Sequence, residues 1–229
     1  MSTVPLSSTR RTGLVDQVIE QLRDAVRQGE WAIGDRIPTE PELAASLDVG
    51  RNTVREAVRA LAHSGLLDVR QGQGTYVRAT SEVSGALRRL CASRLREALH
   101  VRRLLEVEAA RLAATERTDD DLAVLRRLLD ERDALWSQGD LDAFARTDAA
   151  FHLAVAKAAH NDVLSELCRG LTEVVASSVA TTCRADAHEP EPADHRSVVD
   201  AIAARDADRA ARHTREFLDH LLARHPAER

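Results

Sequence analysis

The stretch that decides the fold runs from Ile37 to Val77 and reads IPTEPELAASLDVGRNTVREAVRALAHSGLLDVRQGQGTYV. It opens with a predicted helix, Glu40–Leu47, for which Thr39 supplies the N-cap. A turn at 48–50 leads into a second predicted helix, Arg51–Ser64. Two short helices joined by a three-residue turn are typical of a helix-turn-helix.

The second predicted helix has two different sides. Its apolar residues recur at three- and four-residue spacing and predict one buried face: Val54, Ala57, Val58 and Leu61. Its first turn is polar instead, with Arg51, Asn52, Thr53 and Arg55. A helix-turn-helix offers such N-terminal residues to base edges in the major groove, where Arg suits guanine, while Thr suits phosphates. Arg59 lies further along the helix and is expected to reach phosphate only.

A hairpin follows the second helix. Gly65 ends that helix, and short strands are predicted at Leu66–Arg70 and Thr75–Val77. A hairpin in this place is a wing, and Gln71 and Gly72 at its tip are predicted to enter the minor groove or to contact the DNA backbone.

Composition sets broad limits. The chain has 229 residues, which suits one large or two ordinary domains, and its aromatic content of 3% leaves a core of Leu, Val and Ala that favours packed helices. The net charge is −5, while residues 1–78 hold ten Arg and ten acidic residues, so the prediction of DNA binding depends on the motif and not on bulk charge.

The cysteines and the apolar segments bear on where the protein is found. The three cysteines lie far apart and are read as buried free thiols. No apolar run is long enough to span a membrane and Met1–Arg11 has no signal-peptide core, so we expect a cytoplasmic protein.

The rest of the chain divides into a short N-terminal part, a linker and a helical half. Residues 1–9 are expected to be disordered, residues 10–78 to form the winged helix-turn-helix with an added helix at Thr12–Gln28, and 79–85 to form a linker of small polar residues. Residues 86–226 show no strand pattern and predict an all-α bundle of six or seven helices. The predicted segments are Ser84–Cys91, Leu95–Thr115, Thr118–Ser137, Leu141–Ala159, Asp162–Thr182, Pro192–Arg205 and Ala207–Arg224.

The N-terminal part resembles the winged-helix domain of GntR-type bacterial transcription regulators. The resemblance covers about residues 10–78 and is carried by P-x-E-x-E-L-A, V-x-R-x-T-V-R-E-A-V-R-x-L and G-L-L-x-V-R-Q-G-x-G-T-Y-V. It implies DNA binding. The chain departs from the family pattern at Pro41, where an Arg that contacts DNA often stands.

The second half resembles the effector-binding FCD domain of the FadR branch of that family. The similar segments are Val101–Ala114, Asp148–His152, Asn161–Leu164 and His195–Asp206. With the winged helix before it, this resemblance implies a regulator that binds a palindromic operator as a homodimer and responds to a small effector, which we expect to be an organic acid.

Asp148 and His152 form the core of a candidate metal site. Four residues apart on one predicted helix, they leave the same face, and His195 from a later helix can join them. The resemblance implies a divalent transition metal (Zn, Ni or Mn) held by these three residues and a fourth His. That fourth position falls on Phe217. The substitutes on the same helix are His213, one turn earlier, and His220, nearly one turn later, and we favour His213. The alternative is a polar cluster without metal.

Arg102 has two interpretations. The resemblance implies that it faces the effector cavity, where its planar fork suits a carboxylate. The alternative is an ion pair with Glu106, four residues on. Asn161 matches a family residue, but we interpret it as the N-cap of the next helix.

Three function classes remain in competition. The first is the effector-responsive regulator, which is not an enzyme. The second is a metal-responsive regulator of the same fold. The third is a metal-dependent hydrolase that uses Asp148, His152 and His195, against which stand the lack of an H-E-x-x-H motif and of a glycine-rich phosphate loop.

Overall fold

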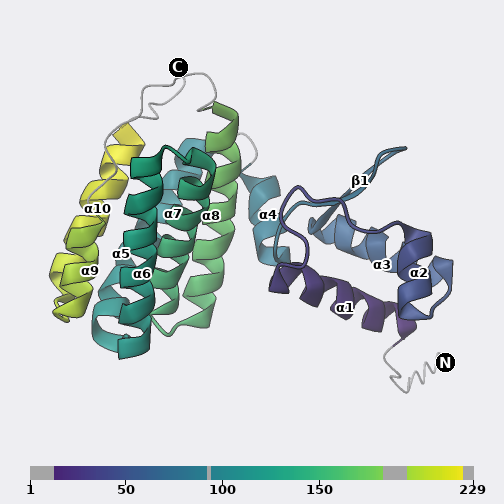
Figure 1. Cartoon of the computed structure of the whole chain (residues 1–229), viewed down its shortest axis with the longest axis horizontal. Coiled ribbons are helices and arrows are strands. Elements are labelled where there is room, and N and C mark those ends of the chain that lie inside the picture. The colour runs from purple at the N-terminus through teal and green to yellow at the C-terminus, as the bar shows by residue number, and fades with distance from the viewer. Residues whose placement is uncertain (1–12, 92–93, 183–194, 224–229) are drawn as a thin grey trace, which may run out of the picture. The chain divides into compact units, whose positions relative to one another are not determined.

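The structure is a computed structural model and describes residues 13–91, 94–182 and 195–223, with side chains described up to residue 175 in the middle range. The expected disorder of residues 1–9 lies outside the described residues. The chain separates into two units, Met1–Ala86 and Leu87–Arg229, each with its own internal packing. Figure 1 shows the helical and winged parts, whose relative placement is not determined.

The first unit is a winged helix-turn-helix. Its elements are α1 (Leu14–Gln28), α2 (Glu40–Leu47), α3 (Arg51–Ser64), β1 (Leu67–Arg70) and β2 (Gly74–Val77), as Figure 1 shows. Local chemistry sets the ends of these helices. Both the backbone N–H and the hydroxyl of Thr39 donate to Glu42 Oε2 at 2.7 Å at the start of α2. Gly65 ends α3 with a φ of 89°, which glycine adopts without strain.

The core of this unit lies between α1, α3 and the wing. α1 packs along α3, and α2 and β1 pack on other parts of α3. The buried side chains are aliphatic: Val18, Leu22, Val26, Ile37, Leu43, Val54, Val58, Leu61, Leu66, Leu67 and Val77. The face of α3 that the sequence predicts to be buried is therefore the face that forms the core.

The wing has a third extended segment beside the hairpin. β1 and β2 pair antiparallel, and an isolated bridge joins Arg36 to Tyr76 on the other edge of β2. The backbone N–H of Ile37 donates to the carbonyl oxygen of Thr75 at 2.9 Å. These bonds fix the base of the wing against the core.

α4 (Glu82–Leu90) begins inside the segment for which the sequence predicts a linker. The side chain of Ser84 is 1% exposed. A Cβ added to Gly85 would stand 2.8 Å from the carbonyl oxygen of Ser64 and from the carbonyl carbon of Gly65, so α4 touches the end of α3 through backbone. The small residues read as linker composition thus allow close packing, and the first turn of α4 belongs to the first unit.

The second unit is a helical bundle. Its elements are α5 (Leu95–Glu116), α6 (Asp119–Gln138), α7 (Leu141–Lys157), α8 (Asp162–Thr182), α9 (Arg196–Ala203) and α10 (Ala207–Ala223), and every regular element in its described part is a helix (Figure 1). α5 packs against α7, α8, α9 and α10, and α6 packs against α7 and α9. Four fully buried alanines on α5 let these neighbours approach closely: Ala109, Ala110, Ala113 and Ala114.

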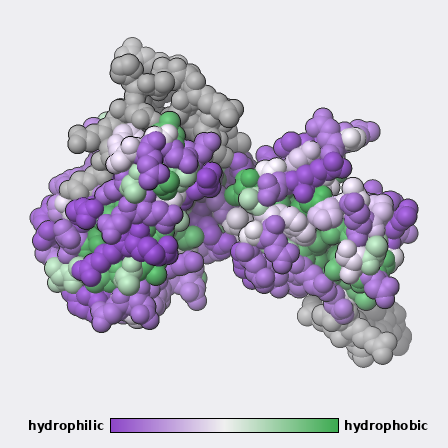
Figure 2. Space-filling view, in the orientation of Figure 1, coloured by the Kyte–Doolittle hydropathy of each residue, from purple (hydrophilic) through white to green (hydrophobic). Residues whose placement is uncertain are grey.

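Helix ends in the bundle are held by side chains. Asn161 Oδ1 accepts the backbone N–H of Leu164 at 3.0 Å, which confirms its interpretation as an N-cap. Two arginines act at C-termini: Arg117 donates to the carbonyl oxygen of Ala203, and Arg205 donates to that of Thr115. On the face in Figure 2, hydrophilic residues predominate over the outer sides of both units. Among the described helices, none combines the length and apolar character that crossing a bilayer requires.

Candidate nucleic-acid interface and candidate metal centre

The start of α3 presents polar side chains to solvent. Arg51, Asn52 and Arg55 are exposed, and Thr53 is half-buried. Between them, Val54 is completely buried. Arg59, one turn later, is also exposed. The structure thus brings the predicted DNA-contacting residues of this helix together on one accessible side.

Arg55 has a partner that the sequence did not suggest. Its Nε donates to Glu40 Oε2 of α2 at 3.1 Å, and both side chains are partly exposed. Such a surface pair contributes only about 0–1 kcal/mol and can exchange for a stronger ligand. The glutamate therefore orients the guanidinium without fixing it permanently.

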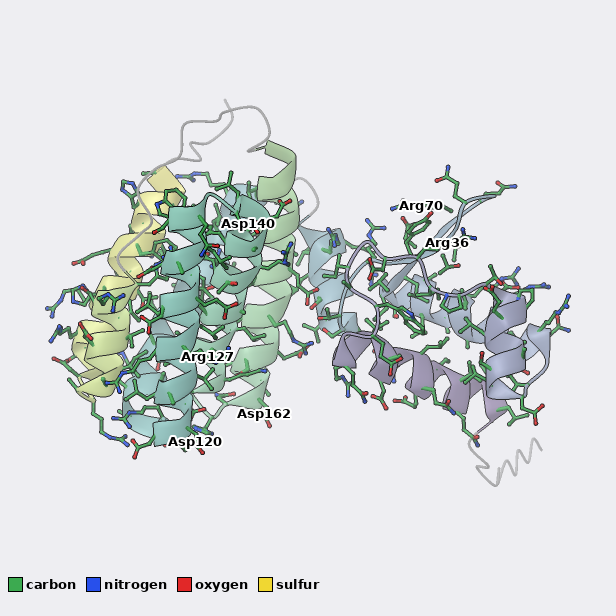
Figure 3. The ribbon with its side chains drawn as sticks, viewed as in Figure 1. Arg36, Arg70, Asp120, Arg127, Asp140 and Asp162 are labelled. Atoms are coloured by element: carbon green, nitrogen blue, oxygen red, sulfur yellow. The ribbon has the colours of Figure 1, made fainter. Side chains whose placement is uncertain are left out.

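The wing tip carries the remaining predicted contacts. Gln71 and Gly72 are exposed, and Gly72 turns the chain with a φ of 74°. Arg70 stacks on the ring of Tyr76 with its Cζ 4.3 Å from the centroid, and Arg36 lies across Gly74. Figure 3 labels both arginines on the wing. Alternation along the strands places Arg36, Tyr76 and Arg70 on one face, a signal that could have added the two arginines to the predicted interface.

The second group of predicted residues meets inside the helical unit. Asp148 and His152 lie on α7, and His195 is the N-cap residue of α9. Nε2 of His152 is 3.2 Å from Nε2 of His195, and the Asp148 carboxylate oxygens lie 3.7 Å and 3.6 Å from these two nitrogens. One donor atom from each residue lies within 4.8 Å of the other two, so the three can share one ion.

Glu106 of α5 lies behind His152. Its Oε2 is 3.1 Å from Nδ1 of His152, and its Oε1 accepts from Nε of Arg102 at 2.5 Å. The side chains of Arg102 and Glu106 are only 7% and 4% exposed. Of the two interpretations of Arg102, the structure shows the ion pair with Glu106.

Arg132 of α6 is a member of this cluster that the sequence did not reveal. Its side chain is 3% exposed, and its Nε donates to Asp148 Oδ1 at 2.7 Å. The guanidinium also lies over the ring of Phe144, 4.8 Å from the centroid. The sequence holds no local signal for this pair, because sixteen residues and a helix boundary separate the two partners.

Phe217 of α10 closes the cluster on the side where the family resemblance expects a fourth ligand. Its ring stacks on His152 with centroids 5.4 Å apart and lies 4.8 Å from the ring of His195. His213 is not placed with the other three, because its Nδ1 lies 3.3 Å from Glu216 Oε2 on the same helix. Thr214 takes the inward position instead.

A small cavity opens beside the two histidines. Its lining combines the polar groups of the cluster with apolar walls: Glu106, Ala109, Phe151, His152, Val155, His195, Val198, Thr214 and Phe217. Its volume of about 20 Å³ is room for about one or two water molecules. Arg102 is not among the lining residues.

The charges inside the cluster hold its carboxylates ionised. Burial acts to raise the pKa of Glu106, but Arg102 and His152 outweigh it and lower that pKa to about 2. Burial likewise opposes ionisation of Asp148, and His152, His195 and Arg132 together bring its pKa below the ordinary value. Burial and the nearby Glu106 raise the pKa of the Cys168 thiol to about 12, so this thiol stays protonated. The result is one buried carboxylate, Glu106, and one half-buried carboxylate, Asp148, each beside a buried arginine.

Known proteins are similar to this chain along most of its length. LutR, an HTH-type transcriptional regulator of Bacillus subtilis, is 34% identical over 69% of this chain and 73% of its own. The Uxu operon regulator of Haemophilus influenzae is 31% identical over 87% of this chain and 77% of its own. A solved structure, Streptococcus agalactiae GntR, superposes with a TM-score of 0.53 at 30% identity and covers 91% of this chain and 99% of its own.

Two family models match the two halves. Residues 14–77 match the model for bacterial regulatory proteins of the gntR family, and residues 97–220 match the model for the FCD domain. The first match contains the helix-turn-helix and its wing, and the second contains the Asp148, His152 and His195 cluster. The chain therefore belongs to the gntR family of bacterial transcription regulators, with an FCD domain after its winged helix-turn-helix.

Proposed function

We propose that this chain is a cytoplasmic regulator that binds a palindromic double-stranded DNA operator as a homodimer. The observation that carries the proposal is the accessible group of Arg51, Asn52 and Arg55 on a helix whose opposite face is fully buried. One winged helix reads one half-site, so a two-fold operator requires two copies of the chain.

The test uses the full chain and a duplex selected from a random-sequence pool. We expect a dimer mass in solution, a selected sequence with two-fold symmetry, and a band shift that weakens steeply as salt rises. A monomer that binds selected and scrambled duplexes equally well would contradict both the dimer and the sequence-specific operator.

The cluster of Asp148, His152 and His195 fits a divalent transition ion such as Zn, Ni or Mn. The donor set of one carboxylate and two imidazoles is one that such ions accept. The 3.2 Å between the two Nε2 atoms is also close to the roughly 3.3 Å that separates two nitrogens on one tetrahedral zinc. A bound ion would supply positive charge and a coordination position open to an oxygen ligand.

We propose a small organic acid as the effector. Arg102 with Glu106 and Arg132 with Asp148 are balanced pairs, so a divalent ion held by neutral histidines gives the cluster a net positive charge. The carboxylate of a small organic acid would pair with that charge, and its short carbon chain would contact the apolar walls of the cavity. Because the cavity has room for only about one or two waters, a side chain such as Phe217 must move to admit it.

The second candidate is a regulator for which the metal itself is the effector, and the fit of the three ligands favours it. The band shift separates the two. Loss of the shifted band on adding a chelator, restored by Zn²⁺ and unaffected by small carboxylates, would support the metal sensor. A change on adding a carboxylate to metal-loaded protein would support the organic acid. The regulator names of the similar proteins favour both over the hydrolase alternative.

A further inference from the structure

Glu106 is a buried carboxylate whose two oxygens have different neighbours. One oxygen, Oε1, accepts from Nε of Arg102 at 2.5 Å, and the other, Oε2, lies 3.1 Å from Nδ1 of His152. Glu106 itself is outside the group of potential ligands formed by Asp148, His152 and His195. The imidazole ring of His152 therefore stands between Glu106 and that group.

The two nitrogens of His152 have different surroundings. Nδ1 faces the Glu106 carboxylate, whereas Nε2 faces His195 at 3.2 Å and Asp148 at 3.7 Å. A carboxylate beside one imidazole nitrogen holds the proton on that nitrogen and leaves the lone pair on the other. The ring is thus arranged to direct its lone pair toward Asp148 and His195.

Arg102 keeps Glu106 in place. The two residues are one turn apart on α5, and both side chains are almost completely buried, so the pair is shielded from solvent. Arg102 also neutralises the carboxylate, which makes its burial tolerable. The guanidinium does not line the cavity, so its contribution passes through Glu106.

We propose that Glu106 is a positioning residue for metal binding, which holds His152 as the Nδ1–H tautomer so that Nε2 faces the ion, and that Arg102 fixes Glu106 for this role. The proposal rests on the metal site of the proposed function. It gives Arg102 a task different from direct contact with an effector carboxylate.

Nitrogen-15 NMR of the imidazoles in metal-stripped protein tests the tautomer directly. His152, assigned by the signals that disappear in His152→Ala, is expected to carry its proton on Nδ1. In Glu106→Leu, which removes the acceptor, the His152 signals are expected to shift toward the Nε2–H tautomer. Wild-type protein with the proton of His152 on Nε2 would overturn the proposal without any further variant.

Chelator competition for Zn²⁺ tests the consequence for affinity in tag-free protein. Glu106→Leu is expected to weaken Zn²⁺ binding by about 10–100-fold, as loss of a residue that orients a ligand does. Glu106→Gln, whose amide oxygen still accepts from Nδ1, is expected to lose less, and His152→Ala to lose more than either. Equal affinity of wild type and Glu106→Leu, at equal helix content by circular dichroism, would refute the role of Glu106.

The outcomes distinguish the positioning role of Glu106 from the metal site of the proposed function. Wild-type protein that binds no Zn²⁺ would remove the metal from the proposed function, and the NMR measurement would still decide whether Glu106 sets the tautomer. Zn²⁺ binding that His152→Ala abolishes and Glu106→Leu leaves unchanged would keep the metal site and remove the positioning role.

Discussion

Helix α3 and the buried cluster of the helical unit place arginines in opposite surroundings. In the winged helix-turn-helix, Arg51 and Arg59 are exposed on α3. In the helical unit, Arg102 and Arg132 are buried, and each lies against a carboxylate from the same unit. An exposed arginine is available to a partner from outside, whereas a buried one needs its counter-charge built into the fold. The difference separates a surface made for DNA from a centre whose charges are already balanced.

Removal of a buried arginine should have the largest effect on the stability of the fold. Arg102→Met leaves Glu106 buried without its cation, and we expect the free energy of unfolding to fall by about 3–5 kcal/mol, measured by urea denaturation. The matched control is Arg111→Met on the same helix, whose ion pairs with Glu108 and Asp208 are at the surface, with an expected loss of about 0–1 kcal/mol. Similar losses in the two variants would show that burial does not distinguish these arginines.

Acid should act on the buried centre through Glu106. The pKa of Glu106 is about 2 in the folded chain against an ordinary value of 4.5, so its carboxylate stabilises the fold fully above pH 4.5. That contribution, about 3 kcal/mol, is lost as the pH falls from 4.5 toward 2. Urea unfolding at stepped pH should therefore show a shallower decline for Glu106→Gln than for wild type, and parallel curves would argue against the depressed pKa.

The exposed arginines should affect DNA binding and leave stability unchanged. Arg51→Ala and Arg55→Ala are each expected to weaken operator binding by about 1–3 kcal/mol if they contact guanine, while Arg59→Ala should cost less and lower the salt slope by about one. Arg27→Ala on α1, also an exposed arginine, serves as the control. Unchanged affinity in both Arg51 and Arg55 variants, in band shifts at moderate salt, would show that α3 is not the recognition helix.

The contact between α3 and α4 gives a smaller effect on stability. Gly85→Ala places a Cβ against the backbone of Ser64 and Gly65, and we expect a loss of about 1–3 kcal/mol because backbone cannot move aside cheaply. Gly13→Ala is the control, since a Cβ there meets nothing closer than 3.8 Å. If thermal unfolding of the two variants matched, α4 would not be packed on α3 in solution.

Features set by residues close together in the sequence could be predicted, whereas contacts between separate helices could not. α3 has the bounds that its caps predicted, Arg51–Ser64, because a helix end is set by residues within one turn. Asp148 and His152 share a face because helical spacing requires it. Arg132 was missed, since its ion pair with Asp148 depends on how α6 packs against α7, and no pattern within either helix reports that packing.

His213 shows where periodicity alone misleads. Its spacing of one turn from Phe217 makes it a candidate ligand, but His213 falls beside the buried stripe of α10, which consists of Ala210, Ala211, Thr214, Leu218 and Leu222. The segment predicted as a linker, 79–85, is helical from Glu82 onward. Small polar residues suit both a mobile connection and a tight helix contact, and only the approach of Gly85 to Gly65 decides between them.

The burial of Ser84 and Gly85 bears on how such regulators can be recombined. A chimaera that grafts this DNA-binding unit onto a foreign sensor is naturally spliced at the last residue of the wing, Val77, where the family match ends. That junction would remove Gly85, which packs on the end of α3. The backbone of Gly65 would then contact side chains of the foreign domain. A splice after Ala86 keeps Ser84 and Gly85 packed on the end of α3. The segment that must be transferred is therefore longer than the family match that identifies the DNA-binding unit.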